Sequence, residues 1–194
     1  MRFLKAAIVL LTIFLFAGIA YSAEINYGLK FATSFTSVSG ELPFPIKLRS
    51  NRNLGFSVGP YMRISTNDRI LSFQPELLLS YGRTDVSLNY PPYDINLETW
   101  YIELPLMVRG AFPMPTKGYF APFIIGGPKV GLKLSDNVEG LGMDLGLFDI
   151  AVVLGLGADF GENSIEVRYS RDMMIDDDEV RKGVVKIFYS RNIW

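Results

Sequence analysis

The sequence lacks cysteine and histidine altogether. Without cysteine the chain can form neither disulfides nor thiolates. Without histidine it has neither the usual near-neutral general base nor the commonest metal ligand. The formal net charge of −1 leaves no basic excess for holding nucleic acid. We therefore expect no enzymatic activity, no cofactor, no metal site and no nucleic-acid partner.

Charged residues are also scarce, at 20%, whereas aromatic residues reach 13% and glycine supplies 18 of the 194 residues. This balance favours extended, tightly packed structure over a solvated helical bundle. No abrupt change of composition divides the chain, and its length suits one domain.

The N-terminus has the pattern of an export signal. Arg2 and Lys5 precede an apolar run that ends at Ala20-Tyr21-Ser22, with small residues at the two positions that a signal peptidase reads. The run is shorter than the roughly 20 residues of a spanning helix. We predict a signal peptide over residues 1–22 and a barrel domain over residues 24–194.

Two central stretches, residues 73–83 and 100–112, alternate between apolar and polar side chains. In the first, Leu77 and Leu79 share one parity while Glu76 lies on the other. This period of two predicts β-strands, each with one continuous apolar face. The same period recurs along the chain, and the eight predicted strands begin near Ile25, Leu54, Phe73, Trp100, Phe120, Ile150, Ile165 and Val185.

The connections between these strands alternate between long and short. Long connections are predicted over about residues 37–53, 84–99 and 135–147 and around the acidic residues 176–179. Long external loops, short periplasmic turns and an even strand number are typical of bacterial outer-membrane barrels. We therefore predict an all-β fold, a closed eight-stranded antiparallel up-and-down transmembrane β-barrel in the bacterial outer membrane, with both termini periplasmic.

Alternation alone does not say which face meets water, because a soluble lipocalin-like barrel alternates equally well. The polar parity is unusually rich in small residues: Gly28, Ala32, Gly55, Ser57, Gly59, Ser72, Ser80, Ala111, Gly127, Gly131, Ala151, Gly155 and Gly157. Small residues suit the crowded interior of an eight-stranded barrel better than a soluble exterior. We expect the apolar face to contact lipid and the charges to lie in the lumen.

Enclosed charges need partners, because an unpaired buried ion costs several kcal/mol. A hairpin turn near Thr116 would place Glu103 opposite Lys129. A turn after Glu162 would bring Asp159 near Glu166 and within diagonal reach of Arg168. The predicted lumen ion network comprises Arg63, Glu76, Glu103, Arg109, Lys129, Asp159, Glu166, Arg168 and Lys186.

Two features conflict with regular strands. Prolines lie inside predicted strands, where each removes a ladder donor, so we expect bulges or bends at Pro60, Pro75, Pro105, Pro122 and Pro128. The terminal Trp194 resembles the signal that the barrel-assembly machinery reads during insertion. It is out of step with the apolar parity of Tyr189, and a bulge near Arg191 would restore the phase.

Four segments resemble the PorT-type outer-membrane β-barrel family of Bacteroidota-like bacteria. They are QPELLLSYG at residues 74–82, YIELPLMVRGAF at 101–112, APFIIGGPKVGLKLS at 121–135 and FDIAVVLGLGADF at 148–160. The resemblance covers nearly all of the predicted barrel domain. It implies an eight-stranded barrel, and for a minority of the family an accessory role in protein secretion.

Four other motifs give weaker indications of a functional site. Glu76 and Glu103 could act as a general acid and a general base. Membership of the lumen ion network explains both residues more simply. The glycines of residues 155–161 miss the spacing of a nucleotide loop. The acidic residues 176–179 lack the ligand spacing of a calcium-binding EF-hand loop and read as solvated, with divalent-cation binding as the alternative. Residues 90–93, Tyr-Pro-Pro-Tyr, are either a contact tip or a rigid turn.

These observations favour a non-enzymatic outer-membrane barrel with a filled, salt-bridged lumen. Its four external loops would contact a partner protein or a surface glycan, while outer-membrane lipid surrounds its wall. A narrow passive channel for ions or small solutes is the first alternative. A soluble secreted lipocalin-like carrier is the second.

Overall fold

The structure is a computed structural model, and it describes residues 24–39, 49–51, 53–66, 69–89, 92–112, 120–136, 148–172 and 181–193. The predicted signal peptide, the acidic residues 176–179, the dipeptide Tyr90-Pro91 and Trp194 lie outside the described residues. Among the described residues we find no helix that is long and apolar enough to cross a bilayer.

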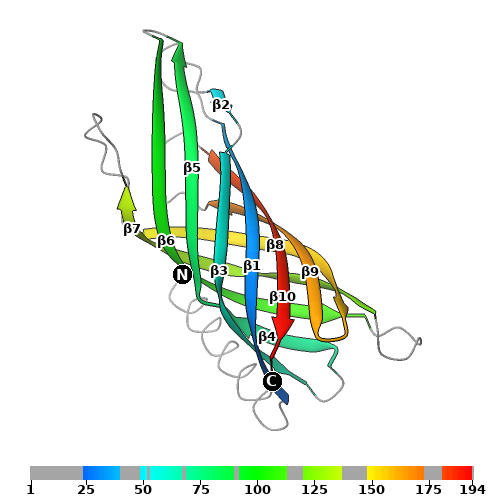
Figure 1. Ribbon diagram of the computed structural model, residues 1–194. Helices are drawn as coiled ribbons and strands as arrows, with labels where there is room; N and C mark the ends of the chain where they lie inside the picture. Colours follow the sequence, from blue (N-terminus) through cyan, green and yellow to red (C-terminus); the bar gives the residue numbers. More distant parts are fainter. Residues whose placement is uncertain are drawn as a thin grey trace, which may run out of the picture.

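The described residues form ten strands in one antiparallel sheet (Figure 1). They are β1 (Glu24–Ser39), β2 (Arg49–Asn51), β3 (Asn53–Ser65), β4 (Leu71–Pro75), β5 (Leu78–Asn89), β6 (Pro92–Ala111), β7 (Ala121–Asp136), β8 (Phe148–Phe160), β9 (Asn163–Asp172) and β10 (Arg181–Asn192). β2 and β3 both pair with β5, and β4 and β5 both pair with β6. β2 and β3 are therefore two parts of one interrupted barrel strand, and so are β4 and β5. The barrel has eight strands in the described part of the chain.

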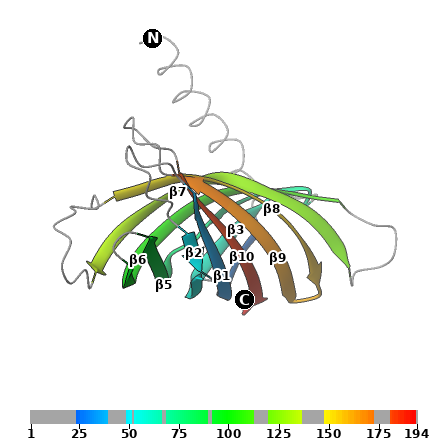
Figure 2. The same ribbon diagram turned by 90° about the horizontal axis from the view of Figure 1, so that it is seen from above.

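The sheet closes on itself through β1. Residues of β1 pair with β10 on one side, from Gly28↔Asn192 to Ser39↔Arg181. On its other side they pair with β3, from Glu24↔Ser65 to Thr36↔Asn53. Figure 1 shows β1 between these two strands, and Figure 2 shows the curvature of the wall from above. The predicted closed eight-stranded antiparallel barrel is confirmed.

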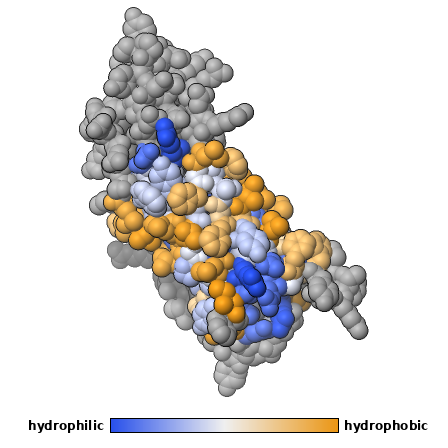
Figure 3. Space-filling model, in the orientation of Figure 1, coloured by the Kyte–Doolittle hydropathy of each residue, from blue (hydrophilic) through white to orange (hydrophobic). Residues whose placement is uncertain are grey.

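The wall has the predicted orientation. Leu77, Leu104 and Val152 are 50%, 44% and 39% exposed, whereas Glu76 and Arg168 are only 2% and 3% exposed. Figure 3 shows apolar side chains over the middle of the molecule. The barrel therefore carries hydrocarbon side chains outside and ions inside, the reverse of a soluble barrel.

Aromatic side chains lie near both ends of the apolar band. At the end with the long connections, the rings of Phe56, Tyr81 and Trp100 are 5.0 to 5.9 Å apart on three neighbouring strands. At the end with the short turns, the rings of Phe120 and Phe160 are 5.3 Å apart. Along β6, the rise of about 3.3 Å per residue at a tilt of about 40° from Trp100 to the turn end corresponds to roughly 30 Å. That is the thickness of a bilayer core.

The expected bulges at the prolines are absent from the described strands. Pro60 stays in register opposite Leu29, and Pro128 opposite Val152. The shift between β6 and β7 falls instead between Trp100 and Tyr101. Among the described residues, the strands of the wall are interrupted between β2 and β3 and after Pro75, where β4 ends, and the β6–β7 pairing leaves out residues 106–107 and 127–128.

The sequence Gly-Pro explains how two prolines fit into a closed wall. The N–H of Leu77 donates to the carbonyl of Pro60 at 3.0 Å, but Pro60 has no N–H to return. A Cβ at Gly59 would lie 1.9 Å from the carbonyl oxygen of Leu77. Likewise, a Cβ at Gly127, which precedes Pro128, would lie 2.1 Å from the oxygen of Leu106. The glycine gives room to the carbonyl that the proline cannot bind, so no extra residue is needed.

Two further expectations are wrong. The predicted long loop over residues 84–99 is mostly a hairpin, because β5 and β6 pair without interruption as far as Asn89↔Pro92. β10 keeps one register with β1 and β9, so no bulge occurs near Arg191. Ile193, which is 50% exposed, continues the lipid-facing parity of Tyr189.

Candidate functional site: a charged lumen

The inner face of the barrel holds a network of buried ions. Every predicted member lies in at least one ion pair: Arg63, Glu76, Glu103, Arg109, Lys129, Asp159, Glu166, Arg168 and Lys186. Lys30 and Asp149 join them. The pairs fall into three clusters along the barrel axis.

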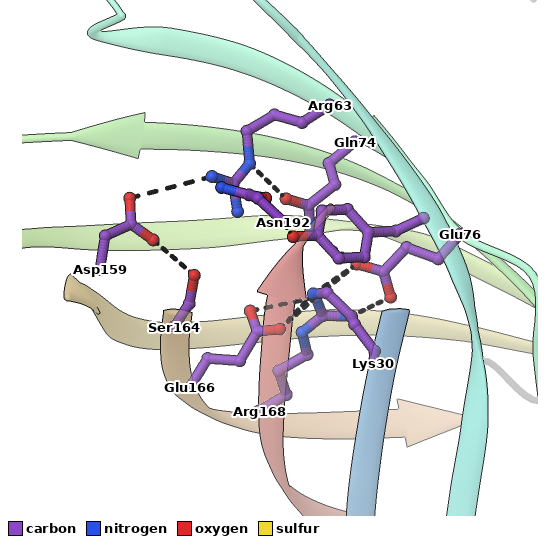
Figure 4. A network of polar contacts seen from close by, with 10 residues as sticks. Lys30, Arg63, Gln74, Glu76, Asp159, Ser164, Glu166, Arg168 and Asn192 are labelled. Carbon is purple, nitrogen blue, oxygen red and sulfur yellow. Dashed lines mark hydrogen bonds and ion pairs between the residues drawn. The ribbon is translucent and has the colours of Figure 1, made fainter. Parts of the chain in front are cut away.

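The central cluster comprises Lys30, Glu76, Glu166 and Arg168 (Figure 4). Arg168 binds Glu76 with two parallel bonds, Nη1 to Oε2 at 2.8 Å and Nη2 to Oε1 at 2.6 Å. Its Nη2 also donates to both oxygens of Glu166, at 3.0 and 3.1 Å. Lys30 donates to Glu76 at 2.8 Å and also to Glu166. Two cations and two anions thus neutralise one another in a fork geometry.

Neighbouring side chains complete the central cluster. Gln74 donates from Nε2 to Glu76 at 2.6 Å and accepts at Oε1 from Nε of Arg63 at 2.9 Å. The ring of Phe188 lies 4.5 Å from the guanidinium carbon of Arg168 and 5.4 Å from Nζ of Lys30. The cations therefore have both carboxylates and an aromatic face around them.

The loop-end cluster comprises Glu103, Lys129, Asp149 and Lys186. Lys129 lies 3.2 Å from Glu103 and 3.4 Å from Asp149, and Lys186 donates to Glu103. The register differs from the predicted one, because Lys129 faces Pro105 and Glu103 faces Gly131. The contact between Glu103 and Lys129 is diagonal, since lysine reaches across two residues.

The turn-end cluster comprises Arg63, Arg109 and Asp159. Arg109 donates to Asp159, and Nη1 of Arg63 lies 3.9 Å from it. Ser164 donates to the same carboxylate at 2.6 Å. The expected pairing of Asp159 with Arg168 is wrong, because Arg168 binds Glu76 across the lumen. Two cations share one carboxylate here, so this cluster is the basic end of the network.

Small residues make room for these large side chains. A Cβ at Gly157 would lie 2.6 Å from the ring of Phe123, the ring on which Arg109 stacks at 3.7 Å. A Cβ at Gly155 would lie 2.9 Å from Cγ of Arg168. The small residues on the polar parity therefore leave space in the lumen for the large charged and aromatic side chains.

Sequence reasoning missed Lys30 and Asp149, although a signal was present. Lys30 shares the inward parity of Gly28, and Asp149 that of Ala151, both of which were assigned to the lumen. Extending the parity rule to every charged residue would have found them. Which cation meets which anion depends on how the closed barrel staggers its strands, and parity does not carry that information.

The arrangement offers little to catalysis. Lys186 donates to Ser57 at 2.9 Å, but the same Nζ also donates to Glu103, so the amine already has a carboxylate partner. Glu76 and Glu103 lie in different clusters, each with two cations. Among the described residues, no group of acidic side chains could hold a metal ion.

The sequence shows which family this chain belongs to. Residues 16–174 match the family described as outer membrane protein beta-barrel domain. The chain is a member of this outer-membrane β-barrel family. The soluble carrier alternative is thereby set aside, in agreement with the exposed apolar wall. No curated protein gives a match.

Solved structures of outer-membrane proteins are similar to this outer-membrane barrel. The crystal structure of neisserial surface protein A has a TM-score of 0.51 at 14% identity and covers 88% of this chain and 99% of that one. The outer-membrane enzyme PagL has a TM-score of 0.49 at 11% identity, covering 84% and 99%. Ail of Yersinia pestis, in complex with the heparin analogue sucrose octasulfate, has a TM-score of 0.44 at 14% identity, covering 89% and 99%. At these identities the similarity supports the fold alone, and that conclusion rests on the structure of neisserial surface protein A.

Proposed function

We propose that this outer-membrane barrel is a non-enzymatic protein whose lumen is closed to bulk flow and whose long-loop end contacts a partner protein or a surface glycan. The observation that supports the proposal is the paired charge inside the wall. Lys30, Glu76 and Glu166 are each 1 or 2% exposed, although all three are ions.

In the central cluster every described charge is paired, so none is available to bind an ion that passes through the lumen. In the central cluster two cations meet two carboxylates, and in the loop-end cluster Lys129 and Lys186 meet Glu103 and Asp149. Removing one member of a buried ion pair costs about 3–5 kcal/mol. A solute that displaced one of these side chains would meet that penalty, so the clusters act as a plug.

The lengths of the connections support an orientation of the barrel in the membrane. The short connection from β3 to β4 and the turn at residues 161–162 lie at the same end as Glu24 and Asn192, the first residue of β1 and the last of β10. Because short turns are periplasmic in this architecture, we place both termini in the periplasm. Export by a signal peptide over residues 1–22 and insertion by the barrel-assembly machinery complete this part of the proposal.

Within the outer-membrane family, we assign the chain to the PorT type, on the four segments quoted above. An accessory role in protein secretion is the function that this assignment favours. This role suits a barrel whose lumen charges are paired with one another, because such a protein would act through its external surface rather than through its lumen.

Single-channel recording in planar bilayers tests the closed lumen. We expect the refolded barrel to give no stable conductance steps. The variant Glu103→Ala with Lys186→Ala removes one pair from the loop-end cluster and serves as a positive control for a loosened lumen. Regular steps from the unmodified protein would refute the plug and establish the narrow passive channel instead.

A further inference from the structure

The turn-end cluster has a charge excess that sets it apart from the rest of the ion network. In the central cluster two cations meet two carboxylates, and the same holds in the loop-end cluster. At the turn end, Arg63 and Arg109 share the single carboxylate of Asp159. Counted over the described residues, the other two clusters are neutral and this one has an excess of one positive charge.

The carboxylate of Asp159 has little capacity left for Arg63. Its Oδ2 accepts from Nη2 of Arg109, and its Oδ1 accepts from the hydroxyl of Ser164 at 2.6 Å. Nη1 of Arg63 lies 3.9 Å from Oδ2, which is beyond hydrogen-bond distance. Figure 4 shows Asp159 between Arg63 and Ser164. Arg63 is therefore attracted to this carboxylate by charge without a hydrogen bond to it.

Several donors of the two guanidinium groups find no acceptor in the described part of the chain. Arg63 donates there only from Nε, to Gln74 at 2.9 Å. Arg109 donates from Nη2, and its Nε is buried without a hydrogen-bond partner. Both residues are buried, with Arg63 7% and Arg109 3% exposed. Since a buried N–H group without an acceptor is costly, the site needs a further ligand that accepts hydrogen bonds.

The site borders solvent and has further donors close by. The side chain of Asp159 is 21% exposed, although it contacts the two deeper arginines. Across the sheet Ser72 pairs with Arg109, and Ser65 pairs with Ser72. All three of these residues are buried on the lumen side of the wall. Their neighbourhood therefore adds two short hydroxyl donors to the guanidinium group, and an oxyanion can accept from both kinds of donor.

We propose that Arg63 and Arg109 form a binding site for a small carboxylate ion at the turn end of the lumen. A planar carboxylate matches the fork of a guanidinium group, and it would accept from the Nη atoms of Arg63. Water supplies acceptors but no charge, whereas one carboxylate makes this cluster neutral like the other two. A dianion would leave an excess of the opposite sign. This binding site goes beyond the closed lumen and the contacts of the long-loop end.

The test measures binding through its effect on folding. The refolded full chain in lipid vesicles is unfolded with urea at constant ionic strength, while sodium acetate replaces sodium chloride. Two charge-assisted hydrogen bonds correspond to a dissociation constant on the order of 10 mM. Acetate at about 100 mM should then raise the equilibrium constant for folding about tenfold, because it binds only the folded chain. Equal stability in acetate and in chloride would refute the site.

A matched pair of arginine variants separates the site from a general salt effect. Arg63→Gln removes the charge excess, whereas Arg191→Gln removes an arginine that is 66% exposed beside the turn residue Glu162. We expect acetate to stabilise Arg191→Gln as much as the unmodified protein, and to stabilise Arg63→Gln no more than chloride does. If the two variants respond equally, acetate acts as a general solute and the site is wrong.

Asp159→Asn tests the charge balance itself. The variant raises the excess to two positive charges, so a dianion should now fit better than a monoanion. We expect the ratio of stabilisation by sulfate to stabilisation by acetate to rise about tenfold over that in the unmodified protein. An unchanged ratio would refute the charge argument. Should Asp159→Asn fail to fold, Arg109→Gln decides: it leaves Arg63 and Asp159 neutral together, and a retained response to acetate would overturn the proposal.

Discussion

Replacing Glu76 with glutamine is the sharpest perturbation of the lumen. The substitution keeps the size of the side chain and removes its charge. Lys30 and Arg168 would then share the single carboxylate of Glu166, leaving one uncompensated positive charge in a site that is at most 3% exposed. Removing one partner of a buried ion pair costs about 3–5 kcal/mol, and we expect Glu76→Gln to destabilise the barrel by an amount in this range.

The measurement is urea unfolding of the refolded protein in lipid vesicles, followed by tryptophan fluorescence. The matched control is Glu162→Gln at the exposed turn between β8 and β9. Its carboxylate lies 3.9 Å from Arg191, and both side chains are more than 60% exposed. Exposed pairs contribute little, so the control should unfold like the unmodified protein. If Glu76→Gln costs no more than the control, the buried network does not stabilise the fold.

A second substitution checks that charge balance is the cause. Lys30→Met alone leaves one cation against two carboxylates. Glu76→Gln with Lys30→Met leaves Arg168 and Glu166, one of each sign. We expect the double variant to be more stable than the sum of the two single losses, with a coupling free energy of about 1–3 kcal/mol. Additive losses would show that shape rather than charge decides the cost.

Three further predictions follow from the wall and its packing. Gly157→Val should cost about 1–3 kcal/mol, since a Cβ there meets the ring of Phe123 at 2.6 Å, whereas Gly82→Ala, with nothing within 4 Å, should be neutral in the same unfolding assay. Leu154→Arg, on a side chain 64% exposed near mid-wall, should cost about 2–4 kcal/mol, and Ile193→Arg at the turn end no more than about 1. The folded barrel should migrate faster on an unboiled gel than after boiling. A band that does not shift would contradict the closed wall.

The fold was predictable because parity along the strands is a local property. A period of two needs only neighbouring residues, and the choice between lipid outside and water outside needs only the size of the residues on the polar parity. Gly155 and Gly157 illustrate this, since both were assigned to the lumen from their size and both make room there for a large side chain.

The partners within the lumen were harder to predict because they are set by closure. Arg168 binds Glu76, which lies 92 residues away on the opposite side of the barrel. That contact exists only once the strands are tilted and staggered around a common axis. The predicted pairing of Arg168 with Asp159 used one hairpin alone, and a single hairpin does not contain the far wall.

The hairpin at residues 84–97 was missed for a different reason. Its asparagines, aspartates and prolines favour turns as residue types, and that signal was given more weight than the alternation of Val86 and Leu88. The alternation is present in the sequence but in the opposite phase, since the apolar residues stand at odd positions up to Tyr81 and at even positions from Val86 to Leu88. A strand that leaves the bilayer meets water outside instead of hydrocarbon, so its outer parity must become polar. This change of phase is the sequence signal that was left unused, and it begins next to the three contacting aromatic rings of Phe56, Tyr81 and Trp100.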